Sequence, residues 1–240
     1  MTRRRFPPAY LAAFVLVVLL GILPLGSLFL QAAGNADAVT AVLQEGVVWD
    51  AALGTLQLAL FTTLIAAALG APLAWLTTRT DIAGARLCKP LLTIPYIVPP
   101  YVAAVAWIQL ANPQSGYLNQ WFGTGTVDIY SMTGLAWVLG LSFYPYVFLT
   151  VRGVLENADP SLEDAARMSG AGTWRVLRDI SLPLMRSAVL SSAGLVFMVT
   201  ASAFGAPALI GTVAREPVLS TFIFEELQAG GPDAMARAAG

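Results

Sequence analysis

The charged residues that could do chemistry in this chain gather in one polar stretch, residues 159–187. The stretch reads DPSLEDAARMSGAGTWRVLRDISLPLMRS, whereas the whole chain of 240 residues is 57% hydrophobic and only 11% charged. Carboxylates in active sites often act together with histidine or cysteine side chains, but this chain has no histidine and one cysteine. A Ser–His pair and the zinc motif H-E-x-x-H are therefore impossible, and G-x-S-x-G and a pair of intramembrane aspartates are also absent. An intramembrane enzyme is accordingly disfavoured, and the stretch is better interpreted as a surface that another protein contacts.

Local signals predict a short helix in the first part of this stretch. Asp159 can cap the helix with Pro160 in its first turn, and Gly170 supplies the left-handed residue that ends it. Glu163 and Asp164 then lie near the positive end of the helix dipole. One face of this helix is unusually small and consists of Leu162, Ala165, Ala166 and Ser169. A helix of about ten residues is marginal in water, so we expect it to pack against a partner.

A second short helix is predicted to follow after Ala171 and Gly172. Thr173 is its expected cap, and Pro183 is expected to mark the next change of direction. The apolar residues of this helix recur at helical spacing and are Trp174, Leu177 and Ile180.

The spacing across both helices resembles the E-A-A–x3–G–x9–I–x–L-P loop of ABC importer permeases, with Asp in place of the usual Glu. The matching residues are Asp164, Ala165, Ala166, Gly170, Ile180, Leu182 and Pro183. The resemblance implies that they form the coupling helix, which docks on a separate ATP-hydrolysing subunit. It also implies an extracytoplasmic substrate-binding protein and a second permease half, fused or separate, as partners. ATP and Mg²⁺ are expected on the ATPase, because this chain has no G-x-x-x-x-G-K-[S/T] loop and needs no cofactor or metal of its own.

The rest of the chain predicts an all-α, polytopic transmembrane helical bundle in lipid, with no feature that indicates nucleic acid. Five spans are expected, at about residues 9–30, 51–77, 91–110, 132–151 and 188–210. The first is too long for the core of a secretory signal, which is the alternative. Residues 234–240 are interpreted as the start of a sixth span, so that 1–240 would be one transmembrane domain, an incomplete permease half.

Lys and Arg residues are distributed unequally between the two sides of these spans. Eleven of the 13 fall on the side of the amino terminus and of residues 159–187, and only Arg215 and Arg237 fall on the other. The positive-inside rule therefore places the amino terminus and the polar stretch on the cytoplasmic side. The resemblance to importer permeases implies that the membrane is a bacterial inner membrane.

Candidates for a transport pathway are the prolines, tyrosines and one serine near the breaks in the spans: Tyr96, Pro99, Pro100, Tyr101, Tyr144, Tyr146 and Ser202. Prolines in a span free backbone carbonyls, so residues 91–110 contain either a plain kink or a helix that borders a pathway. The fourth span is expected to be broken at Tyr144-Pro145-Tyr146. Each tyrosine is as consistent with aromatic packing as with contact to a substrate, and none is assigned as a metal ligand.

Several other stretches resemble the iron(III) branch of the permeases, in which one chain often holds two halves. They are PLAW and TRTD at 72–75 and 78–81, IPYIVPPYV at 94–102, YPY at 144–146, and PALIG and VLST at 207–211 and 218–221. Thiamine and polyamine permeases share parts of this pattern. Iron(III) is therefore the expected substrate, while thiamine, polyamine or amino acid uptake stays open. A channel or structural membrane subunit is a remote alternative.

Overall fold

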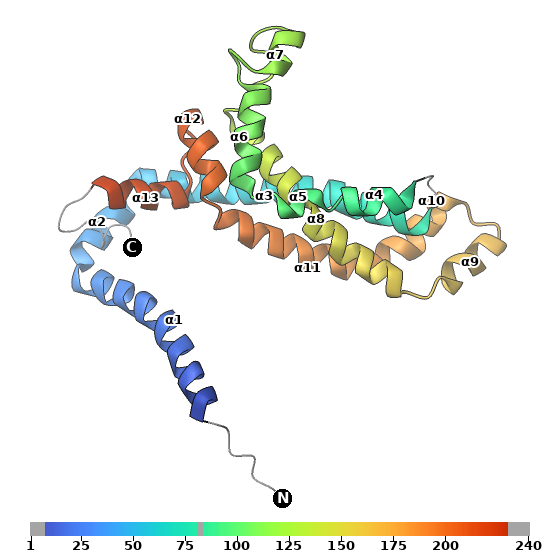
Figure 1. Cartoon of the computed structure of the whole chain (residues 1–240), viewed down its shortest axis with the longest axis horizontal. Coiled ribbons are helices and arrows are strands. Elements are labelled where there is room, and N and C mark those ends of the chain that lie inside the picture. The colour runs from blue at the N-terminus through green and yellow to red at the C-terminus, as the bar shows by residue number, and fades with distance from the viewer. Residues whose placement is uncertain (1–7, 81–83, 230–240) are drawn as a thin grey trace, which may run out of the picture. The chain divides into compact units, whose positions relative to one another are not determined.

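The computed structural model describes residues 8–80 and 84–229 (Figure 1). The described part is helical and contains no strand. Contacts divide the chain into two units, one comprising the residues up to Asp50 and those from Phe222 on, the other Ala51–Thr221. The first unit contains α1 (Pro8–Gly34) and α2 (Ala36–Gln44). The second contains the polar stretch, and its helices position the candidate site.

Four helices in the described ranges are long and apolar enough to cross a membrane, and a fifth crossing exists if one bent pair counts as a span. Three of the four are parts of α1, α3 (Gly46–Arg79) and α8 (Met132–Asn157), and they coincide with the first, second and fourth expected spans. The fourth is the continuous helical segment Thr173–Ala201. The chain is thus a helical membrane bundle, as its composition indicates.

The core of the second unit forms where α3 and α8 approach each other closely. A Cβ atom on Gly70 would lie 2.7 Å from the carbonyl oxygen of Tyr144, and one on Gly140 would lie 2.5 Å from Cγ2 of Ile65. Only glycine fits at these two points, because any side chain would push the two backbones apart. Around them α8 buries Leu135, Leu139, Val147 and Phe148.

The third expected span is not one helix, which corrects the range 91–110. After α4 (Ala85–Leu91), the chain forms α5 (Ile94–Ile97) and α6 (Pro100–Ala111), and the two arms are bent by 99°. Val98 between them is extended, with φ −80° and ψ 120°. Two consecutive prolines cause this break, since each lacks an N–H and each disfavours a helical conformation in the residue before it.

The expected break at Tyr144-Pro145-Tyr146 is wrong, because α8 continues through Pro145 to Asn157. A single proline removes one backbone hydrogen bond, and the close packing of α8 in the core maintains the helix. The bounds of the fifth span are also corrected. The helix begins well before residue 188 and ends at Ala201, and the following residues form η2 (Pro207–Gly211) and α12 (Thr212–Ala214).

Two further segments complete the described part. The short helix α7 (Tyr117–Phe122) follows α6, and its exposed rings are Tyr117, Trp121 and Phe122. The buried Asn119 fixes the loop around α7, since its side chain binds the backbone of Asn112 and Val127. The chain then ends its described part with α13 (Leu219–Ala229). The expected start of a sixth span at 234–240 lies outside the described residues.

Candidate coupling site

The polar stretch begins with a short helix, α9 (Ser161–Met168), which follows a hydrogen-bonded turn at Asp159. At its start, Oδ1 of Asp159 accepts a hydrogen bond of 2.9 Å from the backbone N–H of Ser161. Hydrogen bonds from Ser161 hold the pKa of the Asp159 carboxyl below its ordinary value. The N-cap residue is Pro160, whose side chain makes no capping bond, so the predicted cap lies one residue too early. Asp159 still forms an Asx turn that satisfies the first N–H of the helix, and we call this turn the Asp159 cap.

Gly170 ends α9 in the left-handed conformation that the sequence predicts, with φ +85°. The N–H of Gly170 donates to the carbonyl of Arg167, and the N–H of Ala171 donates to that of Ala166, both at 3.0 Å. These two bonds form a Schellman motif, which satisfies the last carbonyls of the helix. A Cβ at Gly170 would meet no atom of this chain within 4 Å, so the position is constrained by its backbone and not by local packing.

The second helix of the stretch differs from the prediction at both ends. Thr173 is the first residue of α10 (Thr173–Val176) and its side chain makes no capping bond, since the cap is Gly172. Pro183 does not change the direction of the chain either. The π-turn η1 (Leu177–Ser181) leads from α10 directly into α11 (Leu182–Ala201), so that Thr173–Ala201 is one helical segment. The wider π-turn directly before Pro183 accommodates the ring that a regular helix would exclude.

The outer surface of this stretch is apolar and uncovered. Leu162 is 68% exposed, Met168 85% and Trp174 72%. Asp164, Ala165 and Ser169 are exposed beside them, and Ala166 is half-buried. We call the six residues Leu162, Asp164, Ala165, Met168, Ser169 and Trp174 the outer face. Large apolar side chains exposed together are typical of a surface that a partner or lipid covers.

The remaining motif residues line two grooves beside the outer face. Ile180 is half-buried and contributes to a groove of about 320 Å³, whose lining is Asp159, Leu162, Glu163, Asp179, Ile180 and Leu184. Leu182 and Pro183 are exposed and line a groove of about 420 Å³ together with Arg178, Arg186, Val189 and Leu190. The structure therefore brings the seven motif residues into one region, and their role in coupling stays a prediction.

Glu163 points the other way and is the only charged side chain buried in the described part of the chain. Its Oε1 lies 3.4 Å from Nε of Arg79, at the end of α3, and accepts a hydrogen bond of 3.0 Å from Oγ of Ser181. The Arg79 guanidinium also donates from Nη2 to the backbone carbonyl of Ala158, at 3.2 Å. Glu163, Arg79, Ser181 and the Ala158 carbonyl are named the inner cluster here.

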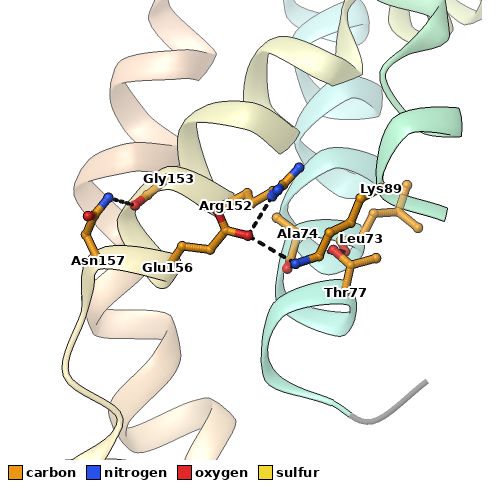
Figure 2. Close-up of polar contacts among 8 residues, drawn as sticks. All are labelled: Leu73, Ala74, Thr77, Lys89, Arg152, Gly153, Glu156 and Asn157. Carbon is orange, nitrogen blue, oxygen red and sulfur yellow. Dashed lines mark hydrogen bonds and ion pairs between the residues drawn. The ribbon is translucent and has the colours of Figure 1, made fainter. Parts of the chain in front are cut away.

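A second cluster binds α8 to α4 near the same polar stretch. Figure 2 shows the carboxylate of Glu156 between Arg152 and Lys89: its Oε1 lies 2.8 Å from Nε of Arg152 and 3.0 Å from Nζ of Lys89. Glu156 is 40% exposed at its side chain. This outer cluster resembles the inner one in chemistry but lies at the surface.

The inner cluster is what sequence reasoning missed. Glu163 and Asp164 are adjacent carboxylates in the same helical turn, and the spacing of apolar residues does not distinguish which of them faces the protein. Arg79 lies 84 positions earlier in the sequence than Glu163, so no local pattern indicates that the two side chains meet.

The candidate pathway residues separate into two groups. Tyr96, Tyr144 and Tyr146 lie together, with the rings of Tyr96 and Tyr146 5.1 Å apart and the Tyr144 hydroxyl donating to the Leu92 carbonyl at 2.8 Å. Tyr101 lies beside Gly205, where an added Cβ would come within 3.2 Å of the Cβ of Tyr101. Gly205 follows the end of α11 and is close in sequence to the exposed Ser202.

Both groups border the break between α5 and α6, next to Pro99 and Pro100. An apolar pocket of about 440 Å³ lies under this break between α5, α6 and α8, with Ile94, Val98, Trp107, Leu141 and Ser142 in its lining. No contact assigns these residues to a substrate, so their place in a pathway also stays a prediction.

Comparison with known proteins gives consistent matches. Residues 66–230 match the family described as "Binding-protein-dependent transport system inner membrane component". The sulfate transport system permease protein CysT of Escherichia coli (strain K12) is 29% identical over 220 residues, which cover 90% of this chain and 79% of CysT. The molybdenum transport system permease protein ModB of the same strain is 31% identical over 163 residues, which cover 66% of this chain and 69% of ModB.

More distant matches add iron and a polysaccharide. The ferric transport system permease protein FbpB of Actinobacillus pleuropneumoniae is 27% identical over 180 residues, which cover 73% of this chain but 26% of FbpB. Among solved structures, a bacterial alginate ABC transporter in complex with a pentasaccharide-bound periplasmic protein has a chain that matches with a TM-score of 0.76. That match has 17% identity and covers 96% of this chain and 87% of the other. At this identity the likeness concerns the fold.

Proposed function

This chain belongs to the family of binding-protein-dependent transport system inner membrane components, and on that premise we propose that it carries a small inorganic ion across the membrane. Its class is settled by its relatives: it is a multi-pass permease subunit of an ABC importer and not an enzyme, and ATP hydrolysis belongs to a separate subunit. The ion, the residues that couple to the ATPase and the cytoplasmic position of the amino terminus are parts of the proposal.

The outer face is the proposed contact with the ATPase, and its exposure is the observation that carries this part of the proposal. Leu162 and Met168 on α9 and Trp174 on α10 expose large apolar surfaces, and Glu163 holds α9 to its own chain. A helix this short needs tertiary contacts to persist, and burying these side chains would stabilise a complex by about 25 cal/mol for each Å² of apolar surface.

Movement of the outer face is proposed to drive alternating access. Closure of two ATPase subunits on ATP would displace α9, and the helices attached to it would rock as rigid bodies around a central pathway. The bent pair α5 and α6 lies beside α8 and offers a discontinuous helix at membrane depth, which is tolerated only against protein or a water-filled cavity. A binding protein outside the membrane would deliver the ion and fix most of the selectivity.

A small oxyanion is the first candidate for the ion. This is supported by the relatives that align over two thirds or more of their own length, which are named as sulfate and molybdenum permeases. Sulfate and molybdate are both tetrahedral dianions of similar size. Donor groups arranged for one of them would therefore suit the other, and the fine choice would rest on the binding protein.

Iron(III) is the second candidate. It is favoured by the stretches at 72–81, 94–102 and 144–146 that resemble iron permeases and by the similarity to FbpB, although the alignment covers only 26% of that protein. Ferric iron prefers oxygen ligands, and the tyrosines near the α5–α6 break are the available ones. Thiamine and polyamine transport have no named relative among these matches to support them.

The test is uptake by the full chain reconstituted in liposomes with the ATPase and binding protein of the same transport system. ATP-dependent accumulation of radiolabelled sulfate or molybdate is expected, with none when the ATPase carries a mutation that prevents ATP hydrolysis. Accumulation of ferric iron alone would replace the first candidate by the second. If none of the three ions accumulates while the complex hydrolyses ATP, the proposal of a small inorganic ion is wrong.

A further inference from the structure

We propose that Glu163 is a positioning residue that transmits movement of the outer face to three membrane helices, a role that rests on the proposed coupling function. The inner cluster is the observation that carries this inference. One carboxylate oxygen contacts both Arg79 and Ser181, and Arg79 in turn binds the carbonyl of Ala158. The cluster therefore joins the end of α3, the connection between α8 and α9, and the π-turn that leads into α11.

The inner cluster is shielded from water, and its contact between Arg79 Nε and Glu163 Oε1 is an ion pair of 3.4 Å without a hydrogen bond at Nε. The side chains of Arg79 and Glu163 are 11% and 6% exposed, and Ser181 is completely buried. Water cannot replace a lost contact there, so the three groups hold one arrangement. By contrast, Leu162 and Met168 on the same helix point outward. The docking surface and the internal attachment thus lie on different faces of α9, and substitutions can separate them.

The charge of Glu163 requires the same partners that would transmit the movement. A buried carboxylate without its cation is strongly unfavourable, so α9 cannot move away from α3 without a large cost in free energy. A displacement of α9 by the ATPase would consequently carry the ends of α3 and α11 with it. Without the ion pair, α9 could still dock, but its movement would no longer be passed on.

The test uses Glu163→Gln in the full chain with its ATPase and binding protein in liposomes. Gln keeps the size and the acceptor for Ser181 but removes the charge that holds Arg79. We expect the ATPase to stay bound within about twofold and ATP hydrolysis to continue, while ions taken up per ATP fall about tenfold, because the interaction with a buried arginine is lost. The ion is the one that the uptake experiment above identifies.

Three comparisons make the result specific. The matched control is Glu156→Gln, which removes a carboxylate with two cationic partners from the exposed outer cluster. It should leave uptake per ATP within about twofold of the wild type, since exposed pairs contribute little. The double variant Arg79→Gln/Glu163→Gln should lose less than the sum of its two single variants, as expected for groups that interact. Ser181→Ala removes one neutral hydrogen bond and should have an intermediate effect.

Each outcome decides between the proposals. Wild-type uptake per ATP in Glu163→Gln, with an active wild-type complex, would overturn the positioning role and leave the proposed function intact. Loss of ATPase binding together with uptake would also overturn it, because Glu163 would then only support the outer face. A wild-type chain that binds no ATPase would refute the coupling function itself, whatever Glu163 does.

Discussion

Glu163 and Glu156 are both carboxylates bound to arginine, and both lie where the membrane helices meet the polar stretch, but their surroundings differ. Glu163 is 6% exposed and has Arg79 and Ser181 as partners from two other elements. Glu156 is 40% exposed and contacts Arg152 on its own helix and Lys89 on α4. The same chemistry therefore occurs once in the interior of the protein and once in reach of water.

Burial decides what such a pair does. In water, the attraction between two charges is weak and is offset by the entropy of fixing two long side chains, so an exposed pair is worth little. In the interior the attraction is much stronger, but so is the cost of removing each charge from water. A buried pair therefore adds little net stability, but it constrains the structure. Separating the two charges, or removing only one of them, costs a large free energy.

Glu163→Ala is expected to have the largest effect in this comparison. It leaves Arg79 buried without its carboxylate and should lower the free energy of unfolding by about 3–5 kcal/mol. The measurement is thermal or denaturant unfolding of the purified chain in detergent, with Glu163→Ala/Arg79→Ala as the control that removes both charges and recovers part of the loss. A change below about 1 kcal/mol would mean that the inner cluster contributes no more to stability than an exposed ion pair does.

Gly170→Val should have the next largest effect. It tests the backbone conformation of the coupling site without changing any of its charges. Gly170 has φ +85°, which a β-branched residue adopts at a cost of about 1–2 kcal/mol. We expect normal insertion in the membrane, weaker binding of the ATPase and loss of transport. The control is Gly172→Val, because Gly172 has φ −68° and ψ 162°, which valine adopts freely. Normal uptake by Gly170→Val would mean that α9 does not couple the two proteins.

The same contrast explains how much could be predicted from the sequence. The left-handed Gly170 and the helical membrane bundle are set by local rules and composition, and the structure confirms them. Asp164 and Glu163 have the same local signals, so the sequence did not reveal that Glu163 is the one that faces inward. That difference arises from Arg79, which comes much earlier in the chain and approaches only after folding.

The prolines show the same limit of prediction from local sequence. Pro99 and Pro100 divide the third expected span into two helices, because two consecutive residues lack an N–H and Val98 becomes extended. Pro145 and Pro183 were expected to interrupt helices as well, but α8 stays continuous through its packing and η1 widens the turn before Pro183. Local rules identify where a helix can break, and the tertiary contacts determine whether it does.

Glu156→Gln should have a small effect and shows how much an exposed carboxylate of this kind contributes to stability. With the carboxylate 40% exposed, we expect a loss of about 0.2–1 kcal/mol in the free energy of unfolding, and a still smaller one in high salt, where exposed charges are screened. Unfolding is measured at low and high salt beside Glu163→Gln, whose loss should depend less on salt. Equal salt dependence of the two variants would show that water reaches both clusters.

The smallest effect concerns the pH dependence of the cap at Asp159, where a carboxylate is fully exposed. Hydrogen bonds from Ser161 lower the pKa of Asp159 in the folded protein, so the folded state favours the ionised carboxyl. The stabilising contribution is therefore complete above the ordinary pKa of an aspartate, about 4, and is lost as the pH falls through the lowered value.

Hydrogen exchange at the first turn of α9 should accordingly become faster, relative to the intrinsic rate, as the pH falls below about 4. Asp159→Asn is the control, because its amide oxygen accepts the same bond without a titrating proton. The pH effect on this turn should be weaker in Asp159→Asn than in the wild type, since only the wild-type cap gains a proton. An equal effect in both proteins would assign the change to other carboxylates and not to the cap.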